Sequence, residues 1–237
     1  MAAALGLLVG LALAFLRNRL RASLKHSSEI ERGAGLPVFA TVPRSEAQVQ
    51  QTKAVKSKAI GSHILVVSDP TDPAVESLRS LHTALQFAML DATTNIVMIA
   101  GATCGIGKSF TSANFAAVLG AADKRVLLVE ADLRKGHLNQ YFGQYRECGL
   151  SEVLSGSVLL ADALRKGVAH NVDFLPTGTL PPNPAEMLMS PGAQTLTTQL
   201  ASMYEIMIID TPPLLAASDT PISAPLARAV FMVAARS

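Results

Sequence analysis

A glycine-rich stretch, Gly101–Phe110 (GATCGIGKSF), places a lysine and a serine at a spacing that suits phosphate binding. Residues Ala102–Ser109 match the pattern G-x-x-x-x-G-K-[ST] at every fixed position except the first, where alanine replaces glycine. Glycines let successive backbone N–H groups converge on phosphate oxygens, and a helix that follows directs its positive end at the same anion. We therefore predict a nucleotide-binding loop, here named the phosphate loop, made of Ala102, Thr103, Cys104, Gly105, Ile106, Gly107, Lys108, Ser109 and Phe110.

Acidic residues close two apolar stretches, RVLLVEAD and EIMIID. Glu130 and Asp132 end the first, and Asp210 ends the second. Because ligands of open α/β sheets gather at the carboxyl ends of strands, we expect these carboxylates beside the phosphate loop. Asp210, together with the Ser109 hydroxyl, is the candidate to hold Mg²⁺, and Asp132 can assist. The alternative for each carboxylate is a helix cap or a turn.

The elements that would position these residues begin near Pro73. The pattern predicts helices over 74–90, 109–122, 150–156, 159–167, 193–203 and 222–227, and a further helix capped at Asn183. It predicts strands over 95–101, 125–132, 172–176, 206–210 and 229–235. The apolar runs do not alternate with polar residues, as expected for strands covered on both faces. Strands alternating with helices predict an α/β fold with a doubly wound, mostly parallel sheet.

The first 21 residues are predicted to form a membrane-spanning helix with a basic flank. Ala2–Leu16 carries no charge, and Arg17, Arg19 and Arg21 follow it, so the positive-inside rule places the rest of the chain in the cytoplasm. A span needs about 20 apolar residues, so we expect this helix to be truncated. A buried or amphipathic helix is the alternative. Residues 22–68 are polar, with one apolar stretch at Gly35–Pro43, and predict a juxtamembrane linker with one strand.

The composition narrows the class of protein further. A chain of 237 residues, less its leader, suits one domain over 69–237. The formal net charge of +2 gives no electrostatic reason to expect nucleic acid as a partner. The two cysteines and five histidines show no metal-ligand spacing, so no zinc site and no disulfide framework is predicted.

Several motifs together resemble the cytoplasmic domain of the bacterial tyrosine kinases (BY-kinases) of capsular and exopolysaccharide export. They are ESLRSLHTAL, ATCGIGKS, VLLVEADLRKG, GTLPPNPAEML and IIDTPP, and the similarity runs from about Leu36 to the end. The resemblance implies a P-loop NTPase fold with Walker A, A′ and B motifs, ATP and Mg²⁺ as cofactors, and phosphoryl transfer to tyrosine. It implies that Lys108 offsets charge on the γ-phosphoryl group and that Glu130, where the family usually has aspartate, accepts the tyrosine proton.

The same resemblance implies partners and a location. Glu76, Arg79 and His82 recur every three residues, which places them on one side of a helix, and in the family such a stripe docks on a neighbouring subunit. We therefore expect a weak, ring-like homo-oligomer at the bacterial inner membrane, with the polysaccharide export machinery and tyrosine-rich tails as partners. A solvated helix face is the alternative for this stripe. We expect the chain to stop short of the family's own tyrosine-rich tail.

Two other functions stay open. The chain could be a P-loop switch ATPase of the partitioning and division-site type, or a membrane scaffold whose nucleotide site only controls assembly. Those ATPases carry a signature lysine early in the loop, where this chain has Thr103, and this favours the kinase. Arg134 is equally a candidate phosphate contact and a solvated arginine.

Overall fold

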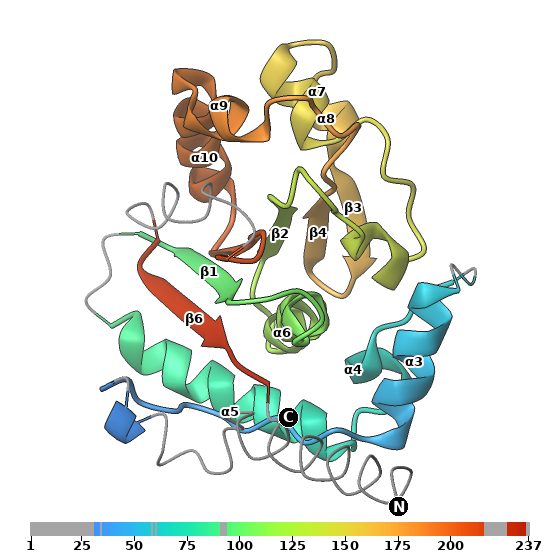
Figure 1. The fold of residues 1–237 in the computed structure, drawn as a ribbon, viewed down its shortest axis with the longest axis vertical. Helices are drawn as coiled ribbons and strands as arrows, with labels where there is room; N and C mark the ends of the chain where they lie inside the picture. The colour runs from blue at the N-terminus through green and yellow to red at the C-terminus, as the bar shows by residue number, and fades with distance from the viewer. Residues whose placement is uncertain are drawn as a thin grey trace, which may run out of the picture. The chain divides into compact units, whose positions relative to one another are not determined.

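A computed structural model describes residues 31–33, 35–57, 59, 61–90, 94–215 and 227–235 (Figure 1). The chain divides into two compact units, residues 39–234 and residues 1–38 with 235–237. In the smaller unit, the backbone N–H of Val38 donates to the Glu31 carboxylate over 3.2 Å. No helix within the described residues is long and apolar enough to cross a membrane, and the membrane helix expected at 1–21 lies outside them.

Within the described part of the larger unit lies a six-stranded sheet with the strand order β3-β4-β2-β5-β1-β6 (Figure 1). Neighbouring strands are parallel except for the β3–β4 pair, which is antiparallel. This sheet confirms the predicted α/β class. In chain order the strands are β1 (Ile96–Gly101), β2 (Val126–Glu130), β3 (Arg165–Ala169), β4 (Val172–Leu175), β5 (Ile206–Asp210) and β6 (Ala229–Val233).

Helices cover both faces of the sheet (Figure 1). One face packs against α4 (Leu65–Ser68), α5 (Pro73–Ala88), α6 (Lys108–Ala121) and the 3₁₀ turn η1 (Leu138–Tyr141). The opposite face packs against α7 (Leu150–Ser155), α8 (Leu160–Ala163), α9 (Pro184–Met189) and α10 (Pro191–Met203). Local sequence explains where α5 and α10 begin. Asp72 and Ser190 each accept a backbone N–H from the first turn of the helix that follows, and a proline comes directly after each of them.

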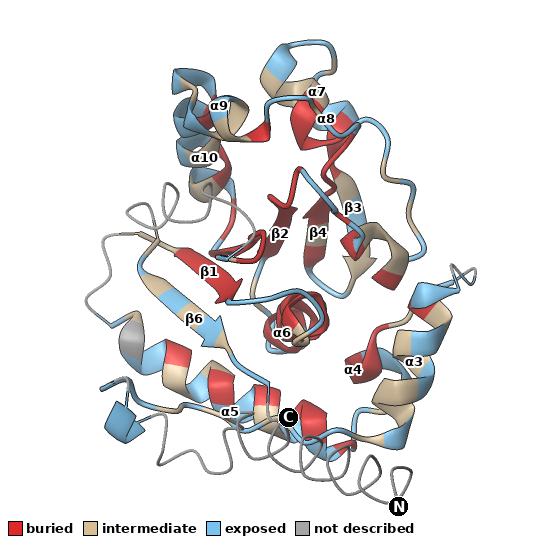
Figure 2. Ribbon diagram, in the orientation of Figure 1, coloured by how far each residue is buried: buried red, intermediate tan, exposed pale blue. Residues whose placement is uncertain are grey.

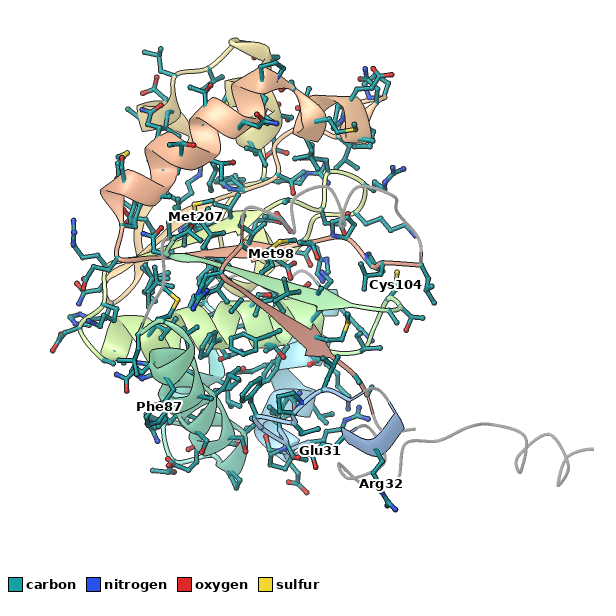
Figure 3. All side chains as sticks on the ribbon, turned by 90° about the vertical axis from the view of Figure 1, so that its left-hand side faces the viewer. Glu31, Arg32, Phe87, Met98, Cys104 and Met207 are labelled. Carbon is teal, nitrogen blue, oxygen red and sulfur yellow. The ribbon has the colours of Figure 1, made fainter. Side chains whose placement is uncertain are left out.

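The two faces divide the core into two layers because side chains alternate along each strand. On β1, Val97 and Ile99 join the layer of α5 and α6, whereas Ile96 and Met98 join the layer of α10. Figure 3 shows Met98 near Met207 of β5 in that second layer. Strands buried on both faces carry unbroken apolar runs, which is why the sequence pattern located them.

Helix α6 lies at the centre of one layer and is buried on nearly its whole circumference (Figure 2). Its sequence, KSFTSANFAAVLGA, accordingly lacks a charged face after Lys108. Close packing also restricts its last turn, because a Cβ atom on Gly120 would lie 2.1 Å from the carbonyl oxygen of His170. The helix that begins at the phosphate loop is thus held firmly in place.

The structure differs from the sequence prediction at 159–167. The helix predicted there stops at Ala163, and Arg165–Ala169 forms β3 at the edge of the sheet. The backbone N–H of Gly167 and the Lys166 ammonium group both bond to the Asp173 carboxylate on the neighbouring β4, at 2.8 and 2.7 Å. Pairing with β4 therefore outweighs the helical pattern, which carried no information about that neighbour.

The segment expected to be a linker also differs. Residues 35–43 contain no strand, and the chain instead forms α3 (Glu46–Lys56), which begins after Ser45, and then α4. Val55, Ile64 and Leu65 are buried in the same layer as α5 and α6. Part of the polar segment thus belongs to the folded unit. The helix expected near 222–227 lies outside the described residues except for Ala227.

Candidate nucleotide-binding site

The phosphate loop connects the end of β1 to the start of α6. Gly105 and Gly107 have φ angles of 78° and 97°, in the left-handed region that favours glycine, and Gly107 immediately precedes the helix. Thr103 and Cys104 are exposed, and Figure 3 shows Cys104 on the loop just past the strand. No side chain within the described residues caps the first turn of α6, so its N–H groups can donate to a bound anion.

The Asp210 carboxylate at the end of β5 accepts hydrogen bonds from three side chains in the first two turns of α6. Its Oδ1 atom lies 3.2 Å from the Lys108 Nζ atom and 2.7 Å from the Ser112 Oγ atom, and its Oδ2 atom lies 3.3 Å from the Ser109 Oγ atom. Asp210 is 1% exposed, and Lys108 and Ser109 are also buried. Three of the predicted site residues, Lys108, Ser109 and Asp210, therefore lie in contact with one another.

Ser112 belongs to this cluster although the motif did not predict it. It lies four residues after Lys108 and three after Ser109, on the same side of α6, and it is fully buried. The helical spacing was a usable signal in the sequence, because residues three and four apart share a helix face. The contact of Ser112 with Asp210 on β5, by contrast, could be identified only from the fold.

Glu130 is buried at the end of β2, opposite Asp210 in the parallel register. Its Oε1 atom accepts the N–H of Leu138 at 2.5 Å, and its Oε2 atom accepts that of Thr177 at 3.2 Å. Burial raises the pKa of this carboxyl group above its ordinary value, and the nearby Asp210 adds to the effect. Gly136 is required beside it, because a Cβ atom there would lie 2.8 Å from the Glu130 carboxyl carbon. The Glu130 side chain thus joins the segments that carry Leu138 and Thr177 at the carboxyl end of β2.

Asp132 lies two residues beyond β2 and forms a turn. Its Oδ1 atom accepts the N–H groups of Arg134 and Lys135, at 3.1 and 3.0 Å, while the Thr177 hydroxyl donates to its backbone carbonyl at 3.3 Å. As whole residues, Asp132 is 8% exposed and Glu130 is 1% exposed. Asp132 therefore forms a turn, which sequence analysis gave as its alternative, and it is also more accessible than Glu130.

The predicted stripe on α5 is only partly exposed. Glu76 and Arg79 are exposed and form an ion pair with each other at 2.9 Å. His82 is half-buried, and its Nε2 atom has no hydrogen-bond partner within the described part of the chain. Burial, helped by Lys124, lowers its pKa below 6.5. The exposed polar surface of the stripe therefore consists of Glu76 and Arg79.

The residues of this site suit a nucleoside triphosphate with Mg²⁺. An uncapped helix start and a buried lysine suit phosphate, and a hydroxyl beside a carboxylate suits Mg²⁺, which typically takes one or two protein oxygens plus phosphate oxygens. No group of three or more His, Cys, Asp and Glu side chains placed to hold a metal occurs within the described residues. Ser109 and Asp210 are thus the direct candidates for the cation.

Comparison with known proteins identifies the family that this chain resembles. The family described as "AAA domain" matches residues 94–222. The putative tyrosine-protein kinase EpsB of Ralstonia nicotianae is 44% identical over 98% of this chain, which spans 31% of the length of that relative. The BceF tyrosine kinase domain superposes with a TM-score of 0.80 at 41% identity, over 89% of this chain and 85% of that one.

A division-site protein matches less well. The septum site-determining protein MinD of Pyrococcus horikoshii, solved with Mg-ADP, superposes with a TM-score of 0.50 at 26% identity, over 60% of this chain and 58% of that one. The kinase domain thus shares far more of the fold. Because of its fold, its phosphate loop and these similarities, we conclude that the chain belongs to the family of bacterial tyrosine-protein kinases.

Proposed function

We propose that the chain binds ATP with Mg²⁺ and transfers the γ-phosphoryl group to tyrosine residues of protein. The contact between Lys108, Ser109 and Asp210, at the start of α6 and the end of β5, carries this proposal. Phosphoryl transfer depends mainly on positioning and on charge neutralisation, and the phosphate loop and its helix provide both. Lys108 offsets charge that develops on the phosphoryl oxygens, while the loop amides orient the phosphates.

Asp132 is our preferred acceptor for the tyrosine proton. The family position usually given this role is Glu130 here, but both Glu130 carboxylate oxygens already accept backbone N–H groups. A general base must come within hydrogen-bond reach of the hydroxyl that it deprotonates. The greater exposure of Asp132 supports this assignment, and Glu130 then orders the loops that carry Asp132 and Thr177.

Tyrosines of other chains are the proposed acceptors. Tyr141 is buried, and burial raises its pKa to about 12. Tyr204 donates to Asp173 and accepts from Lys166, at 2.7 and 2.9 Å, so its hydroxyl is occupied. Tyr145 is 83% exposed. Because the chain itself offers so few accessible tyrosines, we propose that the acceptors are tyrosine-rich tails of neighbouring subunits or of partner proteins.

We further propose a role at the bacterial inner membrane in capsular or exopolysaccharide export. The apolar leader at 1–21, a juxtamembrane linker over 22–68 and the catalytic domain over 69–237 suit this arrangement, with Ile64 and Leu65 packing into the folded unit. The exposed Glu76 and Arg79 on α5 support a weak ring-like homo-oligomer. The small net charge gives no reason to include nucleic acid among the partners.

The test is incubation of the full chain with radiolabelled ATP, Mg²⁺ and a tyrosine-rich acceptor peptide, followed by phosphoamino-acid analysis. We expect phosphotyrosine with the parent chain and none with Lys108→Met. Lys124→Met is the matched control, because this lysine pairs with Glu205 on the surface at 3.3 Å, and it should retain full activity. ATP hydrolysis without phosphotyrosine would favour the switch ATPase, and nucleotide binding without either reaction would favour the scaffold.

A further inference from the structure

We propose that Ser112 is a positioning residue that fixes the orientation of the Asp210 carboxylate toward the Mg²⁺ of the bound nucleotide. The inference rests on the proposed nucleotide-binding function and adds a residue that the phosphate-loop motif does not contain. Ser112 lies on α6 beyond the loop, and its side chain crosses to the end of β5.

The Ser112 hydroxyl makes the shortest contact of the Asp210 cluster. Its Oγ atom lies 2.7 Å from Asp210 Oδ1, compared with 3.2 Å for the Lys108 ammonium group and 3.3 Å for the Ser109 hydroxyl. The carbonyl oxygen of Lys108 is a second possible acceptor at 3.1 Å. The hydroxyl has one proton, and a charged acceptor at the shorter distance forms the stronger bond. Ser112 therefore donates to Asp210.

The three donors differ in what else they can reach. Lys108 and Ser109 begin the helix and belong to the phosphate loop, so their side chains are the ones that phosphate and cation would engage. Ser112 lies one turn further along α6, outside the phosphate loop, and is fully buried, so we assign it no contact with the nucleotide. Its bond to Asp210 is thus the one that can be kept while Lys108 and Ser109 turn to the ligand.

A carboxylate held at one oxygen presents the other in a fixed direction. With Ser112 on Oδ1, the Oδ2 atom stays on the side of Ser109, the other residue assigned to Mg²⁺. Without Ser112, rotation about the Cβ–Cγ bond of Asp210 would be restrained only by donors that the nucleotide competes for. Ligands of this kind depend on such supporting hydrogen bonds, whose removal typically weakens metal affinity about 10- to 100-fold.

Calorimetry on the full chain tests the inference without reference to catalysis. ADP affinity is measured with Mg²⁺ and again with EDTA, and the ratio of the two affinities reports the contribution of the metal. We expect Ser112→Ala to lower this ratio by about tenfold, with little change in the affinity measured in EDTA. Ser112→Thr keeps the hydroxyl and should restore most of the ratio.

Thr111→Ala is the matched control on the same helix. It removes a hydroxyl that donates to the carbonyl oxygen of Gly107, four residues earlier, at 3.0 Å, and that does not bond to Asp210. Its ratio should equal that of the parent. Should circular dichroism find Ser112→Ala unfolded, Ser112→Cys keeps the volume with a weak donor and should also lower the ratio. An unchanged ratio in the folded variant, or an equal fall in Thr111→Ala, overturns the inference. A parent chain that binds no ADP refutes the proposed function itself.

Discussion

Asn114 joins the helix that follows the phosphate loop, α6, to the short helix α4, and its removal should be costly. The side chain is fully buried on α6. Its Oδ1 atom accepts the N–H groups of Leu65 and Val66, at 2.7 and 3.2 Å, and its Nδ2 atom donates to the Phe110 carbonyl at 3.0 Å. Because no side chain of its own segment caps α4, Asn114 provides that cap from another helix.

The cost of Asn114→Ala follows from the two amides that lose their acceptor. A buried donor left without a partner costs about 1–3 kcal/mol, so two such donors cost about 2–6 kcal/mol. The higher helix propensity of alanine returns about 0.5 kcal/mol. We expect the free energy of unfolding to fall by about 2–5 kcal/mol, a large part of the about 5–15 kcal/mol of a typical domain.

Urea unfolding of the full chain, followed by circular dichroism, measures this difference. Asn139→Ala is the matched control, because it removes an Nδ2 bond to the Gln144 carbonyl at 2.8 Å from the partly buried 3₁₀ turn η1. Water can replace that bond, so we expect a loss of about 1 kcal/mol or less. Hydrogen exchange should also speed up at Leu65 and Val66 in Asn114→Ala. The reasoning is refuted if the two variants lose the same free energy of unfolding.

Four further predictions concern acid stability, packing, catalysis and assembly. Burial raises the pKa of Glu152, but hydrogen bonds from Thr179 and Gly149 outweigh this and lower it from 4.5 to about 2. The stability that the Glu152 carboxylate provides is therefore complete above pH 4.5 and is lost as the pH falls toward 2. Glu152→Gln should lower the free energy of unfolding by about 1 kcal/mol at pH 7 and by nearly nothing at pH 2. Urea titrations measure this difference, and the exposed Glu147→Gln should show no such change with pH. Gly120→Ala should destabilise the fold by about 1–3 kcal/mol, because its Cβ atom would lie 2.1 Å from the His170 carbonyl oxygen. Gly192→Ala is the control: the nearest neighbour of its Cβ atom would be 3.7 Å away, so the thermal midpoint should stay unchanged. Asp132→Asn should lower kcat by about 100-fold or more in the phosphotransfer assay, and a smaller fall than in Glu130→Gln would return the role of base to Glu130. Sedimentation at low salt should find an oligomer that Glu76→Ala with Arg79→Ala dissociates, since exposed ion pairs weaken as salt rises. A monomer throughout, or an oligomer indifferent to both changes, would exclude this face.

Much of the site was predictable from local sequence. The predicted phosphate loop is a short contiguous pattern, Ala102–Ser109, whose glycines, lysine and serine suit phosphate binding. The buried strands were predictable for a related reason, since burial on both faces leaves an unbroken apolar run such as that of β1. Asp210 at the end of such a run was predictable because strand ends share one edge of a parallel sheet.

Tertiary structure alone decided which side chains meet across the fold. Ser112 and Asp210 are far apart in the sequence, and nothing in either local pattern specifies their 2.7 Å contact. Glu130 keeps the residue type of a proton acceptor, yet loops from two other segments cover its carboxylate with the N–H groups of Leu138 and Thr177. β3 likewise formed where a helix was predicted, because a strand at a sheet edge is stabilised by its neighbour rather than by its own residues. Contiguous motifs specify chemistry through adjacent atoms, whereas side-chain partners depend on packing between distant segments, which only the folded chain determines.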